Sequence, residues 1–247
     1  MLFGGPDWLP ETAAGQPAWQ LPSGHLLWGL DIVPPTEAFT ISHWFAWAKP
    51  IIEWHRETNT PLLIVGGTWL WMEVLFNPPA SLFVPPDLAW RTEAASRTTS
   101  ELQEKLQQTY PDSWSALNES DKNNARRLIR LWEVKSAPEA QTPQPLLTID
   151  ESRILLRNIS RDEATANIWK RVLERWESGA LQETQVLIDT YKSWDTAAFS
   201  ATGYAPLRAY LEGVLSQDQA LEDWKNSERK YAKRQITWIH LIQKRYQ

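Results

Sequence analysis

Residues 61–76 read PLLIVGGTWLWMEVLF, and this stretch decides the fold class. The apolar run at residues 62–65 is short and continuous, which is typical of a strand buried on both faces of a parallel sheet. Glycines at 66 and 67 then turn the chain, and the apolar residues 69–76 predict a helix. A strand, a glycine turn and a helix in succession indicate an α/β protein.

The sequence on either side extends this α/β pattern. The residues before position 25 are rich in Pro, Gly and Trp and predict irregular structure, and residues 25–32 (HLLWGLDI) predict a strand. Thr40 is the predicted N-cap of a helix that runs to about Glu57. Two further short strands are predicted at residues 146–149 and 154–156.

Helices account for most of the remaining sequence. They are predicted over residues 87–106 and 113–134, and a Pro-rich surface linker follows at residues 136–145. From residue 162 onward the pattern is helical, with a stop at Gly179 and a turn near residues 200–203. We therefore expect an α/β core with a helical C-terminal part.

Composition narrows the chemistry. The 247 residues include no cysteine and four histidines, which excludes a disulfide framework, a Cys-ligated metal and a cysteine nucleophile, and predicts no metal cluster. No stretch approaches the roughly 18 apolar residues that span a bilayer, and no signal peptide is recognisable, which predicts a cytoplasmic protein. The sequence contains neither a Walker A motif nor a recognisable Ser-His-Asp arrangement.

The glycine turn is the first candidate site. Backbone N–H groups at the start of a helix bind anions, and Thr68 adds a hydroxyl. Glycines at such a junction also serve simply to turn the chain. Both interpretations stay open on the sequence alone.

The second candidate is residues 123–134 (NNARRLIRLWEV). As a helix, this segment places Arg126, Arg127 and Arg130 on one face. Guanidinium groups bind phosphate with two parallel hydrogen bonds, so the cluster predicts a phosphate contact. The alternative is a solvated helix face.

The third candidate is the basic C-terminal helix of a chain whose net charge is −5. One stripe contains Lys230, Lys233, Arg234, Thr237, His240 and Lys244, and the other contains Tyr231, Trp238, Leu241 and Ile242. Such a helix binds nucleic acid, a membrane or an acidic helix, or is simply a solvated face. The neutral hydrogen-bonding groups within the basic stripe favour nucleic acid.

Together these segments resemble the tRNA dimethylallyltransferases, also called tRNA isopentenyltransferases. Residues 61–76 are similar to the strand–Gly-Gly-Thr–helix motif of that family, and residues 123–134 to its Asn-Asp-x-Arg-Arg helix. GYAPLRAYLEG and RKYAKRQITWIH resemble its C-terminal block. The motifs occur in the family's order across nearly the whole chain.

The resemblance implies the fold and the activity. The fold is an α/β protein with a P-loop NTPase-like parallel sheet, incomplete at its N-terminus, plus a helical insert and a helical C-terminal part. The reaction transfers a dimethylallyl group from dimethylallyl diphosphate to N6 of adenosine 37, with Mg²⁺ as cofactor. The partner is the tRNA anticodon stem-loop.

The same resemblance implies three regions and a missing segment. The regions are a partial α/β core (1–86), a helical insert domain (87–121), and the remainder of the core with C-terminal tRNA-binding helices (122–247). The family's P-loop, its general-base aspartate and the Mg²⁺ ligands have no counterpart in the sequence. We therefore expect a monomer, or a chain complemented by an N-terminal segment, without which catalysis fails.

Two alternatives stay open. One is a catalytically inactive tRNA-binding relative, or a fragment that needs a separate P-loop partner. The other is transfer to free adenine nucleotides, which the basic C-terminal stripe disfavours because a small substrate has no need of it.

Matching residue by residue, the resemblance assigns Thr68 and Arg171 to the catalytic site. It also assigns tRNA contacts to Arg91, to Arg126, Arg127, Leu128, Ile129 and Arg130, to Ser200, Ala201, Thr202, Gly203, Tyr204 and Ala205, and to Lys233, Arg234, Gln235, Ile236, Thr237, Trp238, Ile239 and His240.

Overall fold

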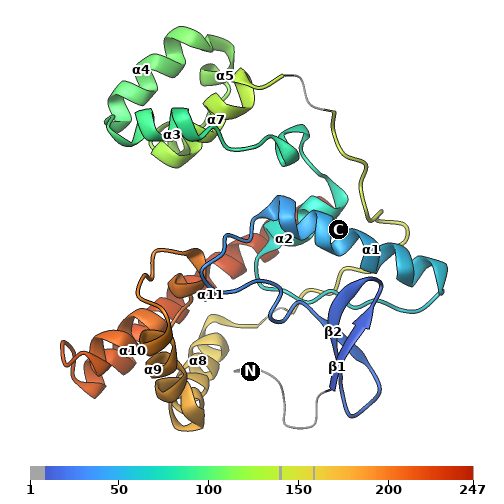
Figure 1. Cartoon of the computed structure of the whole chain (residues 1–247), viewed down its shortest axis with the longest axis vertical. Helices are drawn as coiled ribbons and strands as arrows, with labels where there is room; N and C mark the ends of the chain where they lie inside the picture. The colour runs from blue at the N-terminus through green and yellow to red at the C-terminus, as the bar shows by residue number, and fades with distance from the viewer. Residues whose placement is uncertain (1–8, 139–140, 158, 247) are drawn as a thin grey trace. The chain divides into compact units, whose positions relative to one another are not determined.

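A computed structural model describes residues 9–138, 141–157 and 159–246. The chain divides into two compact units (Figure 1). We call Met1–Glu73 together with Leu146–Gln247 the core unit, and Val74–Pro145 the insert unit. The fold is mixed α/β, as predicted, and helices predominate.

The described part of the core unit contains one small antiparallel sheet, in the order β1-β2-β3. Its strands are β1 (Leu9–Ala13), β2 (Gln16–Gln20) and β3 (Leu26–Trp28). Ala14 and Gly15 join β1 to β2 with positive φ angles of 54° and 68°. Two-residue hairpin turns of this kind favour Asn-Gly or Asp-Gly, so Ala14 gave no hairpin signal and this region was wrongly predicted to be irregular.

Helix α1 (Ile41–Glu57) lies next to this hairpin in the core unit (Figure 1). The predicted N-cap is confirmed: the Thr40 side chain accepts from the backbone N–H of His43, and the His43 side chain bonds the backbone N–H of Thr40. The helix buries one apolar face, formed by Phe45, Ala48, Ile51 and Ile52.

The predicted parallel strands are absent from the described residues. Residues 61–66 are extended but pair with no neighbouring strand, and Leu63 and Val65 are 76% and 82% exposed. Residues 146–149 and 154–156 form no strand either, and the strand predicted at 25–32 shortens to β3. An apolar run becomes a strand only where a partner supplies hydrogen bonds, which periodicity alone does not reveal. The helix predicted after the glycine turn is confirmed as α2 (Trp69–Phe76).

From residue 161 onward the core unit is mostly helical, as predicted. Val172, Leu207, Leu221 and Trp224 form the centre of its packing. The expected stop at Gly179 is a kink with φ 107°. The elements are α8 (Arg161–Arg175), a π-helical turn η2 (Trp176–Ala180), α9 (Leu181–Thr190), η3 (Ala197–Ser200), α10 (Tyr204–Leu211) and α11 (Gln217–Tyr246).

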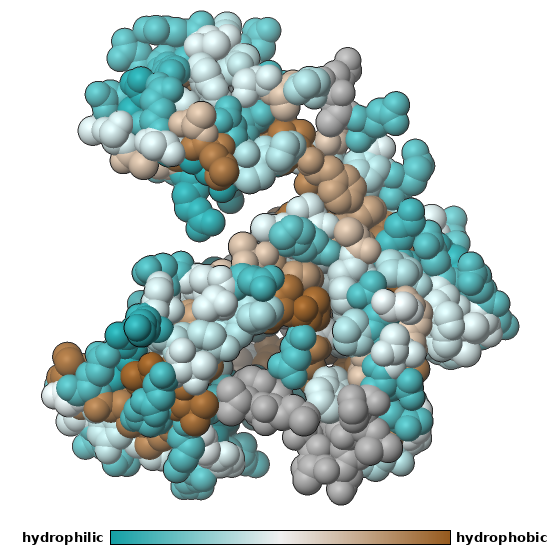
Figure 2. Space-filling view, in the orientation of Figure 1, coloured by the Kyte–Doolittle hydropathy of each residue, from teal (hydrophilic) through white to brown (hydrophobic). Residues whose placement is uncertain are grey.

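The insert unit is a group of short helices around Trp90, Ala94, Leu102, Leu106 and Leu128. Its surface is mostly hydrophilic on the face that Figure 2 shows. The elements are η1 (Ala80–Phe83), α3 (Leu88–Ala95), α4 (Thr99–Thr109), α5 (Pro111–Ser115), α6 (Glu119–Lys122) and α7 (Ala125–Ser136).

Two long helices were predicted here, and both are divided by internal N-caps. Thr98 and Glu101 form a capping box that starts α4, and Asn118 and Asn124 cap α6 and α7. The unit is wider than the predicted insert of residues 87–121, because α7 packs on α3 and α4. Among the described residues, no helix is long and apolar enough to span a membrane.

Candidate functional site

Thr68 lies at the end of the extended segment, immediately before α2, where α11 contacts the glycine turn. The Tyr231 hydroxyl lies 3.3 Å from Thr68 Oγ1, and Gln235 Nε2 donates to the Gly67 carbonyl oxygen at 3.1 Å. A Cβ atom on Gly67 would lie 2.1 Å from Gln235 Nε2 and 2.8 Å from the Tyr231 hydroxyl. A larger residue at position 67 would therefore displace the ends of the Gln235 and Tyr231 side chains from the turn.

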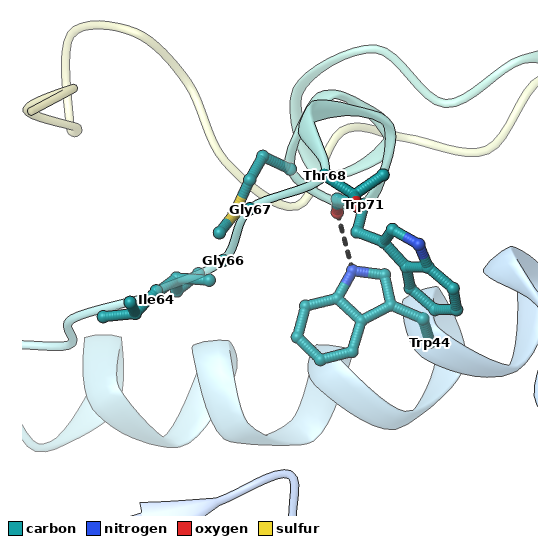
Figure 3. Close-up of a pocket in the computed structure, with 8 residues that line it drawn as sticks. Trp44, Ile64, Gly66, Gly67, Thr68 and Trp71 are labelled. Atoms are coloured by element: carbon teal, nitrogen blue, oxygen red, sulfur yellow. Dashed lines mark hydrogen bonds between the residues drawn. The ribbon is translucent and has the colours of Figure 1, made fainter. Parts of the chain in front are cut away.

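A cavity of about 250 Å³ adjoins this turn (Figure 3). The Trp44 indole N–H donates to the Trp71 carbonyl oxygen at 2.7 Å and so fixes α1 against the start of α2. Residues 64–68 and Met72 complete the lining. The lining is mainly apolar and aromatic, which suits a flat ring or a short hydrocarbon group.

The basic stripe predicted on α11 is exposed. Lys230, Lys233, Arg234, Thr237, His240 and Lys244 all reach solvent. Within the described part of the chain, Lys230, Lys233, Arg234 and Lys244 form no ion pair, whereas Lys225 and Arg229 nearer the start of α11 both pair with Glu222. The opposite, apolar stripe is only partly buried: Ile242 is buried, but Trp238 and Leu241 are 39% and 52% exposed.

Arg171 lies on α8, and its side chain is exposed. One helical turn later, Arg175 is half-buried and faces Glu228 of α11 at 3.4 Å. Burial lowers the pKa of the Arg175 guanidinium, and the positive charge of Arg171 nearby lowers it further. Among the described residues, the Thr68 hydroxyl bonds Tyr231, and no hydrogen bond joins it to Arg171, the other predicted catalytic residue.

The predicted tRNA segment at residues 200–205 is tied to the same helices. Thr202 Oγ1 donates to Glu228 Oε1 at 2.8 Å, and the Tyr204 hydroxyl donates to Glu183 at 2.5 Å. Burial raises the pKa of Tyr204 above its usual value, and the bond to Glu183 adds to this effect. Gly203 is buried with φ 105°, and a Cβ there would lie 2.7 Å from the Trp224 ring.

Two of the predicted arginines of the insert unit, Arg91 and Arg130, converge on the buried carboxylate of Glu133, which is 2% exposed. The Nε of Arg91 donates to Oε1 of Glu133 at 2.6 Å, and its Nη2 donates to Oε2 at 3.2 Å. Arg130 donates Nη1 to Oε2 at 2.9 Å. Burial by itself would raise the pKa of Glu133, but the hydrogen bonds from both arginines outweigh it and lower the pKa.

The remaining predicted residues of α7 differ in their surroundings. Arg130 also donates Nη2 to the carbonyl oxygens of Ser81 and Val84, so its guanidinium is largely occupied within the unit. Arg127 pairs with Asp121, whereas Arg126 is exposed. Leu128 is 0% exposed and packs in the core, so the structure does not support its predicted role as a tRNA contact.

The described residues offer no cluster of side chains to which the expected Mg²⁺ can be assigned. In the described ranges, no group of three or more His, Cys, Asp or Glu side chains lies close enough to hold a metal ion. We therefore assign no metal ligand and derive no step that passes through Mg²⁺.

Sequence reasoning missed one important residue in each unit. Tyr231 was placed only in an apolar stripe, although its position four residues before Gln235 puts both on one side of a helix. Glu133 was passed over because a glutamate near a helix end gives no sign of burial. Its position three residues after Arg130 was the available signal.

Comparison with known sequences identifies the family. A family model described as IPP transferase matches residues 20–242. The tRNA dimethylallyltransferase of Geobacillus thermodenitrificans is 31% identical over 219 residues, covering 85% of this chain and 68% of that protein. The enzyme of the same name from Anoxybacillus flavithermus is 29% identical over 215 residues, with the same shares covered.

Solved structures support the fold. A eukaryotic dimethylallyltransferase, described as acting on tRNA, matches with a TM-score of 0.64 at 23% identity, over 85% of this chain and 55% of that one. The tRNA isopentenylpyrophosphate transferase of Staphylococcus epidermidis gives 0.50 at 24% identity, over 84% and 69%. Because the family model spans most of the chain and agrees with the motifs at residues 61–76, 123–134 and 230–240, the protein belongs to the IPP transferase family.

Proposed function

We propose that this chain acts in the transfer of a dimethylallyl group from dimethylallyl diphosphate to N6 of adenosine 37 in tRNA. The observation that carries the proposal is on α11. One side of this helix contacts Gly67 and Thr68, and another presents Lys230, Lys233 and Arg234 to solvent. A single helix thus joins an exposed basic surface, of the kind that binds phosphates, to the predicted catalytic threonine.

The transfer forms a bond between N6 and the allylic carbon and breaks the bond from that carbon to the diphosphate oxygen. The diphosphate leaves with the electron pair, and the proton that N6 loses passes to solvent. Thr68 would accept a hydrogen bond from the N6 amine, and the cavity beside it would take the extruded base or the hydrocarbon. Arg171, exposed on α8, would stabilise charge on the departing diphosphate.

The finer features of the fold belong to the same proposal. Residues 61–66 would be a strand of a P-loop NTPase-like parallel sheet, which explains why an extended apolar segment precedes the glycine turn. The insert unit would contact the anticodon stem through Arg91 and α7. Residues 200–205 and 233–240 would bind the anticodon loop.

The test measures transfer and binding separately. Radiolabelled dimethylallyl diphosphate is incubated with unmodified tRNA and the protein, with and without a P-loop-containing segment from a relative. Label in the tRNA that depends on Thr68, as judged with Thr68→Val, supports the proposal. Binding of the stem-loop without label in either reaction would contradict the transfer and leave a tRNA-binding role.

A further inference from the structure

Helix α11 holds the Gly-Gly-Thr turn by two side chains one helical turn apart. Tyr231 reaches Thr68 Oγ1, and Gln235 reaches the Gly67 carbonyl oxygen, at 3.3 Å and 3.1 Å. These residues are 163 and 168 positions away along the chain. Gly67 has no side chain, and a Cβ there would displace the ends of both the Gln235 and the Tyr231 side chains.

The same part of α11 has a second, different side. Tyr231 and Gln235 are half-buried, whereas Lys230, Lys233 and Arg234 are exposed. At 3.6 residues per turn, Lys230 and Lys233 lie on a different side of the helix from the two residues that contact the turn. The Arg234 guanidinium lies between the two sides, 5.9 Å from the centre of the Tyr231 ring. An α-helix is stiff over this short distance, so an anion bound on one side and a hydroxyl held on the other keep a fixed relative position.

We propose that Tyr231 is a positioning residue that couples tRNA binding on α11 to the placement of Thr68. The inference rests on the proposed function, because it needs tRNA phosphates on the basic side. The hydrogen bond restricts the Thr68 side chain to one orientation, and the Gln235 bond fixes the backbone just before it. Occupancy of the basic side holds α11 still, and α11 then holds the turn.

The experiment is hydrogen–deuterium exchange with an unmodified anticodon stem-loop as the probe. In the wild-type protein, adding the stem-loop should slow exchange severalfold in peptides that cover residues 64–72. Tyr231→Phe removes one hydroxyl and leaves the cations in place. We expect it to bind the stem-loop with unchanged affinity and to lose most of this slowing.

Two further variants make the result specific. Gly67→Ala places a Cβ against Gln235 and should also remove the slowing, provided that its thermal unfolding remains cooperative. Tyr210→Phe, on α10, removes a hydroxyl elsewhere in the core unit and should behave as the wild type. Where transfer is measurable, Tyr231→Phe should lower kcat about tenfold or less and leave the KM for tRNA unchanged.

The outcomes separate this inference from the proposed function. Equal slowing over residues 64–72 in the wild type and in Tyr231→Phe, with the stem-loop bound to both, would overturn the coupling. A bound stem-loop that slows no exchange there in the wild type would overturn it too. If the wild type binds no stem-loop, the proposed function fails. In that case exchange is compared without the stem-loop, and equal exchange of residues 64–72 in the wild type and in Tyr231→Phe would overturn the role of Tyr231.

Discussion

Helices α7 and α11 carry the same sequence pattern, basic residues at spacings of three and four, but they use it differently. In α7, Arg130 donates to Glu133 and to the carbonyl oxygens of Ser81 and Val84. In α11, Lys233 and Arg234 are exposed and form no ion pair with the described residues. The comparison shows that the spacing of basic residues predicts where the charges lie on a helix but not which groups they contact. In α7 a buried carboxylate already accepts hydrogen bonds from the arginine, which the spacing of the basic residues does not reveal.

The largest effect should follow from removing that carboxylate. Glu133→Ala leaves Arg91 and Arg130 without their shared acceptor and opens a space inside the insert unit. Breaking a buried pair in this way costs about 3 kcal/mol of unfolding free energy. Urea denaturation checks this, with Glu119→Ala as the control, since Glu119 makes only a surface pair with Lys122. A loss similar to that of the control would show that the cluster contributes little.

A smaller effect of the same cluster should appear in acid. The pKa of Glu133 is lowered in the folded state, so its ionised form stabilises the protein. This contribution is complete above the unfolded pKa of about 4.3 and is lost as the pH falls through the lower folded value. Thermal unfolding between pH 6 and pH 3 should therefore fall less steeply for Glu133→Gln than for the wild type. Parallel curves would contradict this assignment.

The basic side of α11 should act on binding and not on stability. Lys233→Ala/Arg234→Ala removes two exposed charges, so stem-loop affinity should fall about tenfold and the log–log salt slope should flatten by about 1.5. Fluorescence titrations from 50 to 200 mM salt measure both. Lys49→Ala/Lys192→Ala makes the same change in net charge elsewhere in the core unit and is the control. Equal effects in both double variants would mean that only net charge matters.

The elements that the sequence predicted well have local causes. Thr40 caps α1 through its own side chain, and Gly179 interrupts the helix through its own φ angle, so both were visible in a few residues. Helix α2 likewise follows from the glycine turn. The break between α3 and α4 could also have been predicted, because Thr98 and Glu101 have the three-residue spacing of a capping box.

The elements that it missed depend on distant partners. Residues 62–65 have the composition of a buried strand, yet a strand also needs a neighbour, and the described residues supply none. Gly67 was predicted to turn the chain or to bind an anion. Neither prediction included its contact with Gln235, which lies 168 residues away in the sequence. Arg126, Arg127 and Arg130 were grouped by their spacing. Their surroundings differ because Arg127 pairs with Asp121 and Arg130 with Glu133, and spacing does not reveal these contacts.

The smallest effect should separate two arginines of α7. Arg126 is exposed, whereas Arg130 is held by Glu133 and by two backbone carbonyl groups. If the insert unit contacts tRNA phosphate through α7, Arg126→Ala should weaken stem-loop binding about threefold and flatten the salt slope by less than one unit, without a change in unfolding free energy. Arg130→Ala should do the reverse: it should lower the unfolding free energy and leave the slope unchanged. The pair of variants measures both quantities on one helix. A flatter slope in Arg130→Ala alone would place the phosphate at the Glu133 cluster, and the difference drawn between α7 and α11 would then be wrong.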